Sequence, residues 1–412
     1  MRRLFKNISN RSILVVLCIF TVLSLIFSSE HLFRTTIFLA FATCIILGLR
    51  QNNMINPYVL FSITPLSLLL YKNLGGIYML DLSDKVWRLA IINIFAFIFT
   101  IFFTPSYKRY SNCIGLNRTS ILIISSICFY LLSFIGGYIP QLNALFWFLS
   151  VAAIVCAIKT KKRIMYAFCA VVILSSILSG HTSKMAVLLQ CITILVCYDK
   201  YFVNTKAKKK KLFLLSVLGA ILMVSAFSFA NKERGRYDAE VGVNYYMDQG
   251  HIEWNYSSAI FMPYMYLTTP WTNLEYIVET QNTRTSGLWA IKPILGYIGL
   301  DENLKHKYEL TPYSTFNTFT FIAVLFKDFG FWGSVILSIF LGYFVKKIYS
   351  RYTISKSPFD ITSYILVALA TAEMFFSNHF FMQSYPFTCL IIMELWKSLI
   401  NLLRISKIEL EN

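Results

Sequence analysis

The succession of long apolar segments along almost the whole chain constrains its fold more than any other feature. Segments of about 20 residues, the length that crosses the hydrocarbon core of a bilayer as a helix, recur along the 412 residues, and only 14% of the residues are charged. A soluble chain has about a quarter charged residues. We therefore expect an all-α integral membrane protein, a polytopic bundle of about 12 transmembrane helices, near 12–29, 33–49, 54–71, 88–104, 119–137, 141–158, 163–180, 184–199, 211–230, 329–345, 360–377 and 385–403.

The basic residues predict how these helices are oriented. If the N-terminus is cytoplasmic and the connections alternate, the inside segments hold 24 Lys and Arg and the short outside connections hold five. Such a bias is typical of cytoplasmic loops. The sequence thus predicts an even number of spans with both termini cytoplasmic. Arg2, Arg3, Lys6 and Arg11 precede the first apolar run, which lacks a good cleavage site and is expected to stay as a span.

The net charge of +18 suggests nucleic-acid binding at first sight, and residues 208–211 form a run of four lysines. That run lies between apolar segments, where lysines usually hold a loop on the cytoplasmic side. We expect no nucleic-acid partner. The nine cysteines show no metal-binding spacing, no Walker-type phosphate-binding loop is present, and no outside loop has a D-x-D sequence. Neither a metal nor a cofactor is expected.

One connection differs from the others. Residues 231–315 are expected outside the membrane and divide the chain into helices one to nine (1–230), a large extracytoplasmic loop (231–315), and helices ten to twelve with a cytoplasmic tail (316–412). The loop is rich in Tyr and Trp, which disordered segments lack. Asn255 to Glu279 predicts amphipathic helix interrupted by Pro263 and Pro270, giving short helices across the outer mouth of the bundle. The aromatic residues either form an interfacial belt or stack on sugars.

Basic residues in this loop predict an anionic ligand. Lys232, Arg234 and Arg236 follow the ninth span, and Arg284 and Lys292 come later. The planar fork of arginine fits phosphate oxygens, although local salt bridges with acidic neighbours would explain the same residues. His181 and Lys184, in the turn before the eighth span, could also bind an anion or belong to an ordinary capped turn. Glu373 and Glu394 are ionisable residues within apolar spans, which indicates a function by default, although Glu373 lies near the outer end of its span and could instead extend its side chain to the membrane interface.

The C-terminal third resembles a known family. Ser314-Thr315-Phe316-Asn317-Thr318-Phe319-Thr320 and the following Lys327-Asp328-Phe329-Gly330-Phe331-Trp332-Gly333 resemble the "N-x-(F/Y)-T … D-F-G-x-x-G" stretch of bacterial O-antigen and oligosaccharide repeat-unit polymerases of the Wzy type. The many spans and the large late outside loop are similar along the whole chain. Relatives often carry an arginine in the turn before span eight, where this chain has His181 and Lys184.

The resemblance implies a metal-independent glycosyltransferase of the bacterial cytoplasmic membrane. It would join undecaprenyl-pyrophosphate-linked oligosaccharide repeat units on the outer face, with a flippase and a chain-length regulator as possible partners. Arg234 and Arg284 would stabilise the leaving pyrophosphate, and Glu279 or His251 would act as general base, with His181 as a third candidate. Substrate contacts are expected from Arg236, His181, Lys184, Lys292, Asn317 and Asp328. An O-antigen ligase or a lipid-linked oligosaccharide flippase would share much of this layout.

Overall fold

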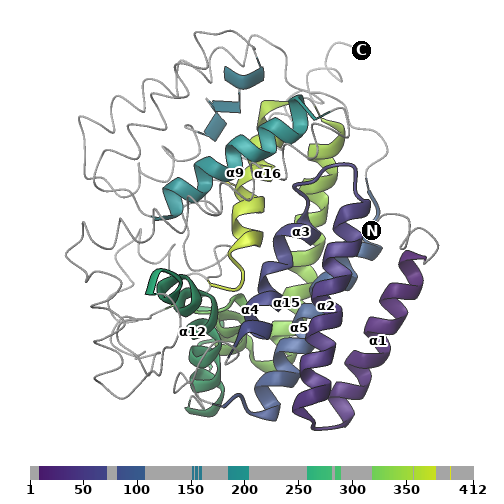
Figure 1. Cartoon of the computed structure of the whole chain (residues 1–412), viewed down its shortest axis with the longest axis vertical. Coiled ribbons are helices and arrows are strands. Elements are labelled where there is room, and N and C mark those ends of the chain that lie inside the picture. The colour runs from purple at the N-terminus through teal and green to yellow at the C-terminus, as the bar shows by residue number, and fades with distance from the viewer. Residues whose placement is uncertain are drawn as a thin grey trace, which may run out of the picture.

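The computed structural model describes residues 9–71, 81–106, 184–203, 258–280, 284–288, 318–355 and 357–376, with short pieces between 151 and 159 and residue 390. All regular secondary structure in these residues is helical (Figure 1). The helices are α1 (Asn10–Ile26), α2 (Glu30–Arg50), α3 (Pro57–Phe61), α4 (Ile63–Leu70), α5 (Asp84–Phe103), α9 (Lys184–Tyr201), α12 (Ser258–Thr280), α15 (Phe321–Ile354) and α16 (Pro358–Ala372).

Three of the described helices, α2, α5 and α15, are long and apolar enough to cross a membrane. Helices α1, α3–α4 and α16 are apolar but shorter. This composition fits a membrane protein. The expected spans at 119–137, 163–180 and 211–230, and most of those at 141–158 and 385–403, lie outside the described residues. The total of about twelve spans therefore stays a prediction.

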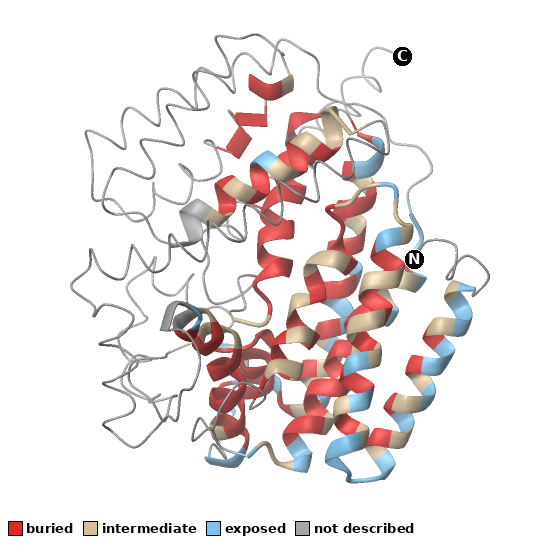
Figure 2. Cartoon of the chain, viewed as in Figure 1, coloured by how far each residue is buried: buried red, intermediate tan, exposed pale blue. Residues whose placement is uncertain are grey.

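Small and polar side chains hold the long helices together. A Cβ added at Gly342 of α15 would lie 2.9 Å from the Phe97 carbonyl oxygen of α5, so the two backbones approach closely at this glycine. Asn93 of α5 donates to Ser334 Oγ at 3.1 Å and accepts from Ser338 Oγ at 2.6 Å. In a lipid bilayer the hydrophobic effect does not drive helices together, so they associate through close packing at small residues and through interhelical hydrogen bonds. Exposed residues, by contrast, are frequent along α1 (Figure 2).

Two helices are too short to cross the bilayer. The α3–α4 segment, residues 57–70, begins at the Asn56 cap, bends at Ser62 and ends at Leu70, and α16 has 15 residues. At about 1.5 Å per residue each covers about 22 Å, against about 30 Å of hydrocarbon. The Tyr364 hydroxyl of α16 donates to the Ile55 carbonyl, just before α3, at 2.8 Å. Both helices therefore start at one end of the bundle and end inside it.

Helix α12 occupies the space beside the end of α4. Its Trp271 and Leu274 are fully buried, and the Trp271 Nε1–H donates to Ser67 Oγ at 2.9 Å. The Tyr264 hydroxyl donates to the Leu70 carbonyl at 3.2 Å, which satisfies a carbonyl at the end of α4. The helix predicted over 255–279 is confirmed at 258–280, but the predicted interruption by its two prolines was wrong. Both prolines lie inside one helix, because tertiary packing outweighs their cost to the helix.

Helix α15 is broken at Gly330, whose backbone has φ 74° and ψ −167°. Residues 321–328 before the break are all buried, whereas the long segment after it carries the exposed apolar side chains of a span. The tenth span, expected at 329–345, is thus the second part of a longer element. The first part begins where the Phe319 and Phe321 N–H groups donate to the Phe376 and Met374 carbonyls, at 3.2 and 2.9 Å. Such irregular backbone is tolerated in a membrane protein where protein surrounds it.

Candidate functional site

Arg284, predicted from the sequence to contact phosphate, is held against the first part of α15. Its Nη1 donates to the Phe326 carbonyl at 2.8 Å, and its guanidinium carbon lies 4.4 Å from the centroid of the Phe326 ring. The residue nevertheless remains exposed. A carbonyl and a ring therefore fix the orientation of a cation that solvent can still reach. This arrangement suits recognition of an anion, because little side-chain entropy is left to lose on binding.

Residues 284–288 form a tight turn that leaves φ positive at Ser286 and Gly287, with values of 50° and 88°. The Leu288 N–H donates to the Thr285 carbonyl at 3.0 Å, which closes the turn. Thr285 then attaches it to α15. Its N–H donates to the Lys327 carbonyl at 3.3 Å, and its hydroxyl donates to the buried Asp328 carboxylate. We name residues 284–288 the arginine turn.

The D-F-G-x-x-G sequence is the part of α15 that receives this turn. Asp328 accepts the Thr285 hydroxyl, and Phe329 lies 3.2 Å from the position that a Cβ on Gly287 would occupy. Gly330 supplies the break and lies under Arg284, whose Cζ would be 3.3 Å from an added Cβ. At Gly333 an added Cβ would lie 2.3 Å from Phe329 Cβ. The D-F-G-x-x-G residues therefore clamp the arginine turn, and Asp328 positions the turn through its hydrogen bond with Thr285.

Two carboxylates join the end of α12 to the start of α5. Glu275 accepts the Ser83 N–H at 2.8 Å and the Ser83 hydroxyl at 3.2 Å, and Glu279 accepts the same hydroxyl at 3.2 Å. Lys85 Nζ donates to the Val278 carbonyl at 3.2 Å. Burial raises the pKa of Glu275, as does the charge of Glu279, whereas the bonds from Ser83 and the charge of Lys85 oppose the rise. Glu279, expected as a general base, is therefore part of a helix junction.

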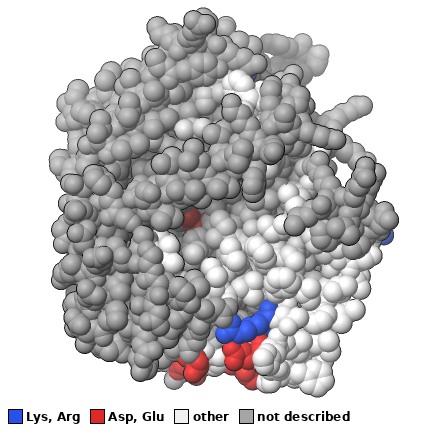
Figure 3. Space-filling model, viewed as in Figure 1, with Lys and Arg blue, Asp and Glu red and all other residues white. Residues whose placement is uncertain are grey.

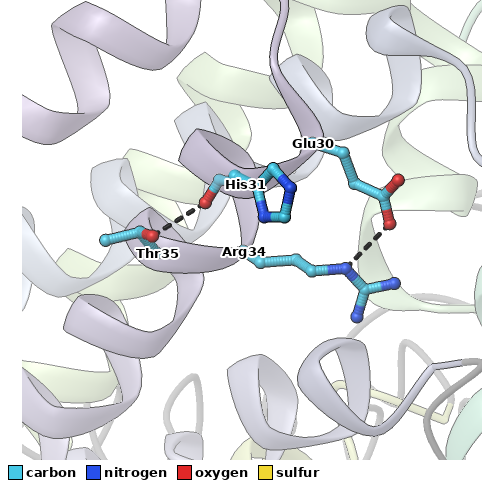
Figure 4. Close-up of polar contacts among 4 residues, drawn as sticks. All are labelled: Glu30, His31, Arg34 and Thr35. Atoms are coloured by element: carbon cyan, nitrogen blue, oxygen red, sulfur yellow. Dashed lines mark hydrogen bonds and ion pairs between the residues drawn. The ribbon is translucent and has the colours of Figure 1, made fainter.

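Further charged residues line the same end of the bundle. Arg88 Nη2 donates to Ser28 Oγ at 2.6 Å, which ties α5 to the α1–α2 connection. Arg34 Nε pairs with Glu30 Oε1 at 2.8 Å (Figure 4), and its guanidinium lies 5.9 Å from the Trp87 ring centroid. Basic and acidic side chains gather at the lower edge of the face in Figure 3. This edge is a band of mixed charge rather than a purely basic patch.

The opposite end of the bundle carries a separate polar cluster. The buried Asp199 carboxylate accepts the Ile55 N–H at 3.1 Å, and Lys200 donates to the Tyr352 and Thr353 carbonyls at 2.5 and 3.1 Å. Arg50 donates to Asn10, so both residues lie at this end as well. Residues assigned inside from the charge pattern thus lie together, at the end opposite Arg34, Lys85 and Arg88. The alternation of the connections along the chain and the compartment that each end faces stay predictions.

Several predicted site residues lie outside the described residues: Arg234, Arg236, His251, His181, Lys292 and Asn317. Lys184 is the first residue of α9. Sequence reasoning missed Thr285 and Glu275, and it missed that Asp328 acts on the arginine turn. The only sequence signal for the clamp was the spacing of the glycines at 330 and 333. This signal is weak, because a glycine needed for close approach looks the same in sequence as any other.

Comparison with protein-family models, with curated proteins and with solved structures finds no match for this chain.

Proposed function

We propose that this chain is a membrane glycosyltransferase of the polymerase type, which joins lipid-pyrophosphate-linked oligosaccharide repeat units on the outer face of the bacterial cytoplasmic membrane. Both termini would then be cytoplasmic, and the end that holds Arg284 would face outward. The hydroxyl of an acceptor sugar attacks the anomeric carbon of the donor, and the lipid pyrophosphate leaves. No external energy source is needed, because pyrophosphate is already a good leaving group.

The observation that carries the proposal is the clamped and exposed guanidinium of Arg284. Negative charge develops on the leaving pyrophosphate, and a preorganised cation placed there lowers the barrier without reorganising. The planar guanidinium can bond two phosphate oxygens at once. One of its nitrogens is already committed to the Phe326 carbonyl, which fixes the direction in which the others point.

Replacing Arg284 tests this proposal. Arg284→Ala should leave the amount of protein in the membrane unchanged and lower polymer formation about 10²- to 10³-fold, the usual effect of losing one such stabilising donor. Arg284→Lys should recover only part of the activity, because an ammonium group lacks the planar fork. The measurement is a gel of surface polysaccharide from a deletion strain that carries each variant.

Arg34→Ala is the matched control, since Arg34 lies at the same end but pairs with Glu30. It should give a normal ladder of chain lengths. A full ladder from Arg284→Ala would refute the role of Arg284 as the phosphate contact.

One observation favours a second candidate, a transporter or flippase for lipid-linked oligosaccharide. Helices α4 and α16 end inside the bundle, and Glu373 lies buried where α16 ends. Broken helices with an ionisable residue near their ends are typical of transporter binding sites. An O-antigen ligase is a third possibility through the shared donor lipid.

The deletion strain separates these functions. Loss of a polymerase leaves a single repeat unit on the surface lipid. Loss of a ligase leaves no units there and strands polymer on the carrier. Loss of a flippase leaves single lipid-linked units on the cytoplasmic leaflet. The first outcome supports the proposed function, and either of the others contradicts it.

A further inference from the structure

A group of polar residues lies where α16 ends inside the bundle. Residues 373–376 turn back after α16, with the Phe376 N–H donating to the Glu373 carbonyl at 2.8 Å. This turn is paired through backbone hydrogen bonds with residues 319–321, the start of α15. Figure 1 shows the lower end of α16 approaching α12. By helix length, the turn lies about 22 Å along α16 from its first residue, which is less than the roughly 30 Å of a bilayer's hydrocarbon core.

Helix α12 contributes the other residues of this group. The Asn273 side-chain amide donates to the Thr318 carbonyl at 2.7 Å, and the ring of Tyr266 lies 5.2 Å from that of Phe376 between centroids. Both rings are only partly buried, whereas Glu373 is 9% exposed. The carboxyl group and one aromatic ring belong to the turn after α16, and the carboxamide and the other ring belong to α12; the contact between the two rings brings these two segments together.

These side chains have the chemistry that binds a sugar. A carboxylate accepts hydrogen bonds from hydroxyl groups, a carboxamide both donates and accepts them, and aromatic faces pack against C–H-rich surfaces. A carboxylate is costly inside a membrane protein and marks a functional site by default.

We infer that Glu373 is the catalytic base for the acceptor sugar hydroxyl, in a subsite formed with Asn273, Tyr266 and Phe376. The inference rests on the proposed function and adds the acceptor side of the reaction to it. Glu373 and Arg284 are both attached to residues 319–328, Glu373 through the backbone pairing of its turn and Arg284 through Phe326. One rigid, buried segment therefore sets the spacing between the base and the phosphate contact.

The step balances without a further reactant. The proton of the acceptor hydroxyl moves to the Glu373 carboxylate while its oxygen forms a bond to the anomeric carbon of the donor. The bond from that carbon to the pyrophosphate oxygen breaks, and its electron pair leaves with the pyrophosphate. Glu373 then returns the proton to water. A positioned general base contributes about 10²- to 10⁴-fold to the rate.

The test uses the purified full-length protein with lipid-linked repeat units extracted from a strain that lacks it. Glu373→Gln keeps the shape of the side chain and removes its basicity. It should lower polymer formation at least about 100-fold and leave the affinity for undecaprenyl pyrophosphate within about twofold of the unsubstituted protein. Glu373→Asp should recover part of the rate. Glu30→Gln, at an exposed ion pair, is the control and should be fully active.

Equal polymer formation by Glu373→Gln, or loss of its carrier affinity, overturns the inference while Arg284→Ala still tests the proposed function separately. If the unsubstituted protein makes no polymer, the proposed function itself fails, and the inference fails with it. If Glu373→Gln does not fold, the Tyr266 variants decide. Tyr266→Ala should raise the acceptor concentration needed for half-maximal rate at least about fivefold, and Tyr266→Phe should not. An unchanged requirement in Tyr266→Ala overturns the subsite.

Discussion

At the scale of single residues, the site depends on one backbone conformation. Gly330 has φ 74° and ψ −167°, a region open almost only to glycine, and it lies against the Arg284 guanidinium. Without this conformation, α15 could not break where the arginine turn docks. A residue 46 positions later in the chain thus leaves room for the Arg284 guanidinium, whose orientation the Phe326 carbonyl and ring fix.

Gly330→Ala should therefore damage the site and the fold together. The backbone strain costs about 1–3 kcal/mol, and the new Cβ would lie 3.3 Å from Arg284 Cζ and press on the guanidinium, so polymer formation should fall, though less than in Arg284→Ala. Thermal unfolding in detergent and the polysaccharide gel measure the two effects. Gly342→Ala is the comparison, because its Cβ clashes with α5 far from the site. It should lower stability and leave the activity per folded molecule unchanged; equal loss of that activity in both variants would contradict the clamp.

At the scale of elements, α12 is fixed at both ends of its buried half. Tyr264 and Trp271 attach it to α4, and Glu275 and Glu279 attach it to the start of α5. The arginine turn follows four residues after α12 ends. Glu275 accepts the N–H of Ser83, the residue that caps α5, so a carboxylate from another helix occupies the positive end of the α5 dipole. These contacts hold α12 in place against α4 and α5, and the arginine turn follows α12 in the chain.

The junction predicts an unusual pH dependence of stability. The folded state raises the pKa of Glu275 above its ordinary value of 4.5, so it favours the protonated form. The resulting stability is present in acid and is lost as the pH rises through the raised pKa. Glu275→Gln keeps the acceptor for Ser83 and removes the buried charge. Its melting temperature should fall less than that of the unsubstituted protein between about pH 4 and pH 8; an identical slope would show that Glu275 does not cause it.

At the scale of the whole molecule, polar residues are divided between two ends. The end with Ser28, Ser83 and Glu279 contains the arginine turn, and the end with Asn10, Ile55 and Asp199 contains Lys200 and Tyr352. Between the ends, α5 and α15 pack through Asn93 and Gly342. This division is what the alternating distribution of Lys and Arg predicts for a protein that crosses a membrane several times.

Cysteine labelling in intact cells tests which end faces outward. A cysteine at the exposed Ser286 should react with a membrane-impermeant maleimide added outside, and one at the exposed Thr353 should react only after the cells are opened. The unsubstituted chain, with its nine native cysteines, gives the background. The reverse pattern would overturn the orientation, and with it the proposal that Arg284 meets lipid-linked glycan on the outer face.

The membrane character, the described spans at α2 and α5 and the candidate Arg284 follow from the sequence alone. The length of an apolar segment and the bias of basic residues between connections are properties of the sequence itself, so they can be recognised without knowing how the helices pack. The number of spans and the six site residues outside the described part stay predictions. The two prolines in α12 led to the wrong prediction that the helix is interrupted. The free-energy cost of a proline to a helix is local, and it does not show how much burial elsewhere offsets it.

Only the tertiary structure decided the rest. It placed α12 inside the bundle, broke α15 at Gly330, turned Asp328 into a partner of Thr285, and brought the turn at 373–376 beside α12 and the start of α15. Each of these depends on contacts between segments that are far apart in the chain. Their hydrogen bonds and close approaches exist only once the helices have packed, and no pattern of neighbouring residues encodes which distant partner a buried group will meet.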